Sequence, residues 1–98
     1  MVEVSWTPQA IDDVDSIADF IAKDSPYYAH LFVIDIFGAV NRLHDFPRSG
    51  RIVPEIKNPL IREIILGNYR IVYRSRAKSV EILTVYHGAK LLNPAKIK

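Results

Sequence analysis

The chain contains no cysteine, one tryptophan, one methionine, and no apolar run near the length of a membrane span. Without cysteine it has neither a disulfide nor a thiolate metal site, which is compatible with a reducing compartment. A spanning helix needs about 20 apolar residues, and the N-terminus lacks a basic segment followed by an apolar core and a cleavage site. We therefore expect a cytoplasmic protein with no membrane partner.

The composition is that of an ordinary globular protein. Its 98 residues suffice for one hydrophobic core but not for two. Hydrophobic residues make up 49% of the chain and charged residues 24%, far from the composition of disordered segments. We predict one domain over residues 1–98 that needs no cofactor.

Charge is unevenly distributed, although the formal net charge is only +2. Residues 1–47 carry eight acids against Lys23 and Arg42, whereas the other eleven basic residues follow them, against three glutamates. This asymmetry favours an anionic partner, either nucleic acid or an acidic protein segment. A solvated basic face is the alternative.

Two helix starts are marked in the same way, at Thr7-Pro8 and Ser25-Pro26, by an N-cap residue followed by proline. Apolar residues at helical spacing predict a first helix to about Lys23 and a second that ends after Phe46, together an antiparallel hairpin. The second helix carries two apolar stripes, so we expect it to be sandwiched between the first helix and a sheet, or to form a homodimer contact. On the first helix a group of aspartates lines a solvent face rather than a metal site: Asp12, Asp13, Asp15 and Asp19.

The segment from Pro47 to Pro59 is predicted to be a surface loop, because three prolines and Gly50 exclude regular structure. Arg48 and Arg51 flank Ser49-Gly50, where backbone amides and two guanidinium groups can hold a phosphate. A solvated linker between helix and sheet fits these residues equally well.

Four strands are predicted, a short one over Val2–Trp6 and three near the C-terminus, over Leu60–Leu66, Tyr69–Ser75 and Val80–His87. Gly67-Asn68 favours a primed two-residue turn between Leu60–Leu66 and Tyr69–Ser75.

Pairing across the turns places Arg70 opposite Ile65 and Val85, and Val72 opposite Leu83. Glu63 and His87 then lie diagonal to Arg70 on the sheet face away from the helices. We expect this apolar and charged face to be a binding surface covered by a partner segment, with the C-terminal tail as the alternative cover. Its predicted contact residues are Ile65, Val72, Arg74, Leu83 and Val85.

Short motifs in a specific order resemble the RelE/ParE superfamily of bacterial type II toxin–antitoxin toxins. They are Trp6-Thr7-Pro8, Ser25-Pro26, Phe46-Pro47 with Gly50-Arg51, Pro54-Glu55, Arg62-Glu63, Tyr69–Tyr73 and Val85–Gly88. The resemblance implies an α+β fold in the order β-α-α-β-β-β, with the helical hairpin packed on one face of an antiparallel sheet. It also implies a small antitoxin that binds across the toxin and mediates any contact with operator DNA, in a hetero-oligomer.

The resemblance leaves the cellular target open. RelE-like members cleave mRNA on the ribosome with several clustered cations. Arg70 matches the family's strand arginine, and Lys90 roughly matches a later basic position, which we group with Arg48 and Arg51 as anion-binding residues. However, Glu63 and Ile65 stand where RelE has lysines, and no tyrosine follows Lys90.

A second ribonuclease pattern in the superfamily uses a glutamate, an arginine and a histidine. Glu55 or Glu63, together with Arg70 and His87, can supply this set, and a histidine can act as acid or base near neutral pH. The structural alternative is that Arg70 pairs with Glu63 and that His87 merely ends a strand.

The motifs around Gly50-Arg51, Pro54-Glu55 and Arg62-Glu63 resemble ParE, whose members inhibit DNA gyrase without a nuclease centre. Our leading hypothesis is therefore a ParE-like gyrase inhibitor. The alternatives are a ribosome-dependent mRNA endonuclease and a degenerate toxin that binds only its antitoxin and operator DNA.

Overall fold

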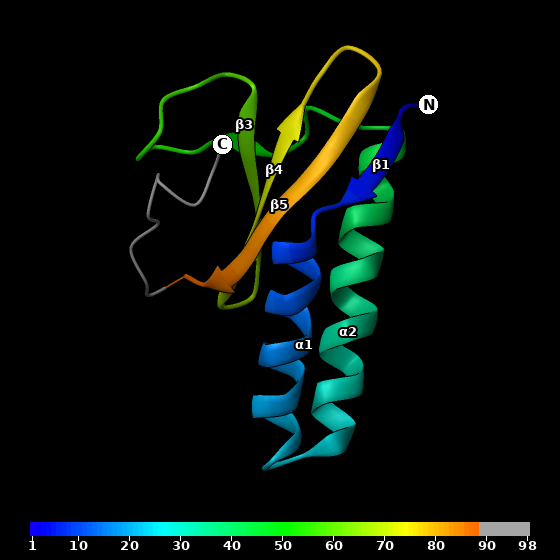
Figure 1. Cartoon of the computed structure of the whole chain (residues 1–98), viewed down its shortest axis with the longest axis vertical. Helices are drawn as coiled ribbons and strands as arrows, with labels where there is room; N and C mark the ends of the chain where they lie inside the picture. Colours follow the sequence, from blue (N-terminus) through cyan, green and yellow to red (C-terminus); the bar gives the residue numbers. More distant parts are fainter. Residues whose placement is uncertain (89–98) are drawn as a thin grey trace.

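The computed structural model describes residues 1–88 as a helical hairpin packed on one face of a five-stranded sheet (Figure 1). The elements are β1 (Glu3–Trp6), α1 (Pro8–Ala22), α2 (Pro26–Asn41), a 3-10 turn (Arg42–His44), β2 (Arg51–Ile52), β3 (Ile61–Leu66), β4 (Tyr69–Ser75) and β5 (Ser79–His87). The predicted α+β class is confirmed. The sheet, however, is mixed: its order is β1-β5-β4-β3-β2, and β1 runs parallel to β5 while the other pairs are antiparallel.

Both predicted helix starts are confirmed by their caps. Thr7 Oγ1 accepts a hydrogen bond of 3.1 Å from the Ala10 amide, and Ser25 Oγ accepts one of 3.2 Å from the Tyr28 amide. The Thr7 hydroxyl also donates to the Ile82 carbonyl at 2.8 Å, which fixes the start of α1 on β5. The two helices lie antiparallel and their far ends project beyond the sheet (Figure 1).

The main core lies between the helices and the sheet. Phe32 and Ile36 of α2, with Leu43 of the 3-10 turn, pack there with apolar strand residues that include Ile71 and Ile82. As predicted, the second helix packs against both the first helix and the sheet. The expected burial of its second apolar stripe is not found among the described residues, because Ile34 and Phe37 are each 51% exposed. Within residues 1–88, one of its two apolar stripes is buried.

A β-bulge changes the predicted register between β4 and β5. Arg74 pairs with Glu81 as predicted, but Val72 pairs with Thr84 and Arg70 with Tyr86, one residue beyond the predicted partners. Leu83 is the additional residue, so every later side chain of β5 changes face. As a result Val85 points to the helices, and Tyr86 takes the place beside Arg70 that was predicted for Val85.

Asp13 on α1 is bonded to the strand just after the bulge. Its carboxylate accepts hydrogen bonds from the Thr84 hydroxyl and, at 3.1 Å, from the Val85 amide. The Val85 amide donor is thus satisfied by a helix side chain. The prediction that all the α1 aspartates line a solvent face is therefore wrong for Asp13.

The segment between the second helix and β3 covers the sheet face away from the helices. Val53 and Ile56 pack there against Val72 and Leu83, in a second and smaller hydrophobic cluster. The same segment contributes the two-residue β2, which corrects the prediction that it contains no regular structure. Strand pairing is possible there because Arg51 and Ile52 precede Pro54 and retain their amide donors.

Candidate functional site

Arg70 is the centre of a charged cluster on the loop-covered face of the sheet. Its Nη2 donates to Glu63 Oε2 at 2.9 Å, and its Nε lies 2.9 Å from Glu63 Oε1, an ion-pair contact without hydrogen-bond alignment. Arg51 Nε on β2 donates to the same Glu63 Oε2 at 2.6 Å. The Glu63 side chain is completely buried between these two guanidinium groups.

The outer side of Arg70 is also occupied. Its Nη1 donates to Glu55 Oε2 at 3.0 Å and to the Tyr86 hydroxyl at 2.8 Å. The guanidinium carbon lies 5.6 Å from the centre of the Tyr86 ring. Two arginines and two glutamates therefore balance one another's charges within the cluster.

The pKa values of these groups reflect the pairing. Burial acts to raise the pKa of Glu55, but the hydrogen bond from Arg70 and the positive charges of Arg70 and Arg51 outweigh it, so this pKa lies below 4.5. Burial acts to lower the pKa of Arg70, whereas its bond to Glu55 and the charge of Glu63 raise it above its ordinary value. Burial also raises the pKa of Tyr86 despite the opposing charge of Arg70. All three groups keep the charge state in which they pair.

Gly50 positions Arg51 in this cluster, a role that the sequence analysis missed. The Gly50 amide donates to the buried Tyr73 hydroxyl at 2.9 Å, and Arg62 Nη1 donates to the Gly50 carbonyl at 3.0 Å. A Cβ at residue 50 would lie 2.6 Å from the Glu63 carbonyl oxygen, so only glycine fits. Burial raises the pKa of the Tyr73 phenol, which keeps the hydroxyl neutral.

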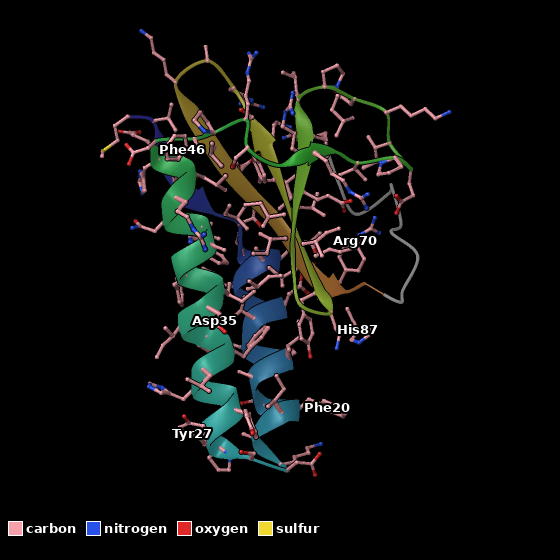
Figure 2. The ribbon with its side chains drawn as sticks, turned by 180° about the vertical axis from the view of Figure 1, so that it is seen from behind. Phe20, Tyr27, Asp35, Phe46, Arg70 and His87 are labelled. Carbon is pink, nitrogen blue, oxygen red and sulfur yellow. The ribbon has the colours of Figure 1, made fainter. Side chains whose placement is uncertain are left out.

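His87 lies apart from this cluster on the sheet. The bulge pairs His87 with Tyr69, and the two rings meet edge to face with centroids 5.5 Å apart. The predicted diagonal arrangement of His87 and Arg70 on one face is therefore wrong. Figure 2 shows His87 at the end of β5, beyond Arg70 along the sheet. The two residues nevertheless line one open cavity of about 440 Å³ at the β3–β4 turn, together with Arg51.

The predicted exposed apolar face is absent from the described part of the chain. Val72 and Leu83 are buried beneath the loop, and Val85 is buried on the helix side by the shifted register. Arg74 pairs with Glu81 at 3.4 Å. Ile65 is the predicted contact that remains open, at 54% exposure.

Two of the three predicted anion-binding residues lie within the described part of the chain. Arg51 is paired with Glu63, Arg48 is exposed, and Lys90 lies outside the described residues. Among residues 1–88, no three histidine or acidic side chains are grouped closely enough to hold a metal ion. No helix in that range is long and apolar enough to cross a membrane.

The sequence was compared with models of known protein families. Residues 4–92 match the model of the ParE toxin of the type II toxin–antitoxin system parDE. The chain belongs to the ParE toxin family.

Two curated relatives of this ParE-family toxin are themselves named as toxins. It is 41% identical to the toxin-named protein Y4kP of Sinorhizobium fredii, over 87% of this chain and 86% of that protein. It is 29% identical to Toxin RelE2 of Caulobacter vibrioides, over 93% of this chain and the whole of that protein.

Solved structures agree with the fold. A chain of the chromosomal ParDE system from P. aeruginosa superposes with a TM-score of 0.73 at 27% identity, covering 89% of this chain and 96% of that one. The RelBE2 toxin–antitoxin complex from Mycobacterium tuberculosis gives a TM-score of 0.61 at 23% identity, covering 92% and 97%, which supports the fold alone.

The toxin also has a groove along the outer edge of β3, which the sequence analysis did not predict. Within the described residues, β2 pairs with β3 at Arg62 and Glu63, and Ile64–Leu66 pairs with β4 alone. Cavities of about 500 and 320 Å³ adjoin this edge and share Leu66. Their other wall is α2 and the turn after it, between Tyr28 and Phe46. Asp35 and Phe46 mark the middle of α2 and the far end of this wall in Figure 2.

Proposed function

We propose that this ParE-family toxin inhibits DNA gyrase, arrests growth, and is neutralised by a co-encoded antitoxin. The proposal rests mainly on the ion pairs around Arg70. Glu63 pairs with both Arg51 and Arg70, and Glu55 pairs with Arg70, so both arginines of the cluster already have carboxylate partners. The match of residues 4–92 to a ParE model supports the same branch.

The ribonuclease chemistry makes demands that this cluster meets poorly. Cleavage at the ribose 2′-OH needs a base, an acid, and a cation free to stabilise the charged phosphorane. The guanidinium of Arg70 is directed at Glu63, Glu55 and Tyr86, so an RNA phosphate would have to displace a carboxylate. A scaffold role for Arg70 explains its contacts more simply.

A ribosome-dependent mRNA endonuclease is the second candidate, because one observation favours it. Arg51, Arg70 and His87 line the same 440 Å³ cavity despite the bulge. In this alternative His87 would transfer the proton and Arg70, released from Glu55, would bind the phosphate.

The two candidates are separated by the exposed residue His87. We expect the purified toxin to inhibit gyrase supercoiling, and His87→Gln to inhibit it equally. Primer extension on ribosome-bound mRNA should show no new cleavage. Cleavage by the original chain that His87→Gln abolishes would instead establish the ribonuclease, and normal supercoiling with intact mRNA would favour a toxin that only binds its antitoxin.

For the antitoxin we propose docking along the open edge of β3 instead of the face predicted from the sequence. An extended antitoxin segment can pair with the backbone of Ile64–Leu66 and place apolar side chains against Ile65 and Phe46. Contact with operator DNA would then be made through the antitoxin.

Hydrogen exchange tests this interface. Bonds alternate along β3, with Leu60 accepting from Ser75 of β4 and Ile61 accepting from Val53, so the Ile65 amide points to the open edge. This amide should become protected when antitoxin is added, and Ile65→Asp should weaken the complex. Leu60→Asp, an exposed apolar position outside both groove cavities, is the matched control. Unchanged exchange at the β3 edge would contradict this docking mode.

A further inference from the structure

The hairpin bears a second recessed apolar site, away from β3. A cavity of about 280 Å³ opens between α1, α2 and the end of β1, lined by Trp6, Ile11, Val14, Asp15, Val33 and Phe37. Five of these six side chains are apolar. The Trp6 and Phe37 rings form one wall, and their centroids lie 5.2 Å apart.

The rim of this cavity presents apolar surface to solvent. Ile11 is 48% exposed, and Phe37 and its neighbour Ile34 are each 51% exposed. Exposed apolar side chains around an apolar recess are typical of a docking site for another protein.

The charges around the recess define the complementary partner. Between Pro8 and Asn41 the only basic side chain is Lys23, apart from His30, and of the aspartates there Asp13 is bonded to β5 while Asp35 lines the groove beside β3. Asp15 lines the cavity, and Asp19 follows one turn later on the same side of α1. An occupant with apolar anchors and flanking lysines or arginines would match both features.

The charge of the same surface disfavours a second copy of the toxin. In a two-fold contact each surface residue meets the equivalent surface of the partner. Asp15 and Asp19 would then approach acidic groups in a partly dehydrated interface, which is destabilising.

The walls of the recess also indicate the form of the occupant. They consist largely of helical side chains, and the backbone groups inside a helix are bonded within it. Recognition must therefore come from side chains rather than from strand addition. We propose that this acidic apolar recess binds a basic amphipathic helix of a partner protein, an inference that does not depend on whether gyrase is the toxin's target.

Trp6 provides a direct readout, because it is the only tryptophan of the chain and lines the recess. We would titrate the full toxin with a synthetic leucine–lysine peptide patterned as an amphipathic helix and record Trp6 emission. Saturable binding with a blue shift is expected. A leucine–glutamate peptide of the same pattern should not bind, although the toxin's net charge of +2 would favour it.

Variants localise the binding. Ile11→Ser and the double change Asp15→Lys with Asp19→Lys should each weaken peptide affinity about tenfold, a loss of about 1.4 kcal/mol. Ile65→Ser, a similarly exposed apolar position in the other groove, should leave it unchanged. Circular dichroism would verify that each variant is folded.

Three results would overturn the proposal. The first is a Trp6 emission spectrum that does not change at the highest peptide concentration, and the second is equal affinity for the basic and the acidic peptide. The third is a Trp6 spectrum that changes with toxin concentration in the absence of peptide, together with dimerisation of the toxin in sedimentation.

Discussion

The two faces of the sheet are stabilised in different ways. The helix face carries the larger core, in which Phe32, Ile36 and Leu43 pack on apolar strand residues. The loop face has a smaller cluster of four buried apolar residues, Val53, Ile61, Val72 and Leu83, next to the Arg51–Glu63–Arg70 ion pairs.

This difference determines how each face responds to substitution. Apolar packing is spread over many contacts, so a polar change at the edge of the helix face removes little of it. The loop face depends on a buried carboxylate whose partners cannot be replaced by water. Single polar substitutions should therefore destabilise the loop face most.

The largest effect is expected for Glu63→Ala. Removing one partner of a buried ion pair costs about 3–5 kcal/mol because the remaining charges lose their compensation. Urea unfolding would measure the loss. The control Glu81→Ala removes the more exposed pair with Arg74 and should cost about 1 kcal/mol or less. Equal losses for the two variants would contradict the special role of the loop-face cluster.

The next effect concerns the backbone that carries Arg51. In Gly50→Ala the new Cβ would meet the Glu63 carbonyl oxygen at 2.6 Å, so the loop must move away from β3. We expect a loss of about 3 kcal/mol, at the upper end for overpacking.

Gly38→Ala is the matched change on the helix side. A Cβ there has no neighbouring atom within 4 Å, and the residue lies within α2. This variant should gain about 0.5–1 kcal/mol from reduced backbone entropy in the unfolded chain. Thermal unfolding would measure the stability of both glycine variants. A change in stability of the same sign in Gly50→Ala and Gly38→Ala would contradict the proposed difference between the two faces.

A smaller effect is expected where α1 binds the bulge. Asp13→Asn removes the charge from the bonds to Thr84 and the Val85 amide, and should cost about 2 kcal/mol. Hydrogen exchange at the Val85 amide should accelerate, whereas Asp12→Asn, an exposed neighbour, should leave it unchanged. Unaltered exchange in Asp13→Asn would show that the bulge does not depend on this carboxylate.

The sequence was informative wherever a local rule determined the structure. Thr7-Pro8 and Ser25-Pro26 predicted both helix starts, and Gly67-Asn68 predicted the β3–β4 register through Leu66 and Tyr69. The predicted β4–β5 register is wrong beyond Val72, where the bulge is bonded to Asp13, 71 residues from Thr84 in the chain. A contact of that separation leaves no trace in the alternation of one strand.

The candidate site was likewise predicted only where it depends on local contacts. Arg70 and Glu63 were recognised as neighbours because β3–β4 pairing is local. Burial of Val72 and Leu83 depended instead on how the proline-containing segment folds back, which its turn residues do not specify. Gly50 was noticed as a loop residue, but its contact with Tyr73 is again a tertiary one.

The smallest effect concerns the rim of the loop face and depends on pH. The pKa of Glu55 lies below its ordinary value of 4.5, so its pairing with Arg70 stabilises the fold above the unfolded-state pKa and is lost as pH falls through the folded-state pKa. Because Glu55 is partly exposed, we expect Glu55→Gln to cost about 1 kcal/mol or less at neutral pH. Urea unfolding at a series of pH values should show this difference shrinking below about pH 4.5, and also shrinking in high salt at neutral pH. A difference that instead grew on acidification would mean that Glu55 destabilises the loop face, and that the cluster around Arg70 is held by Glu63 alone.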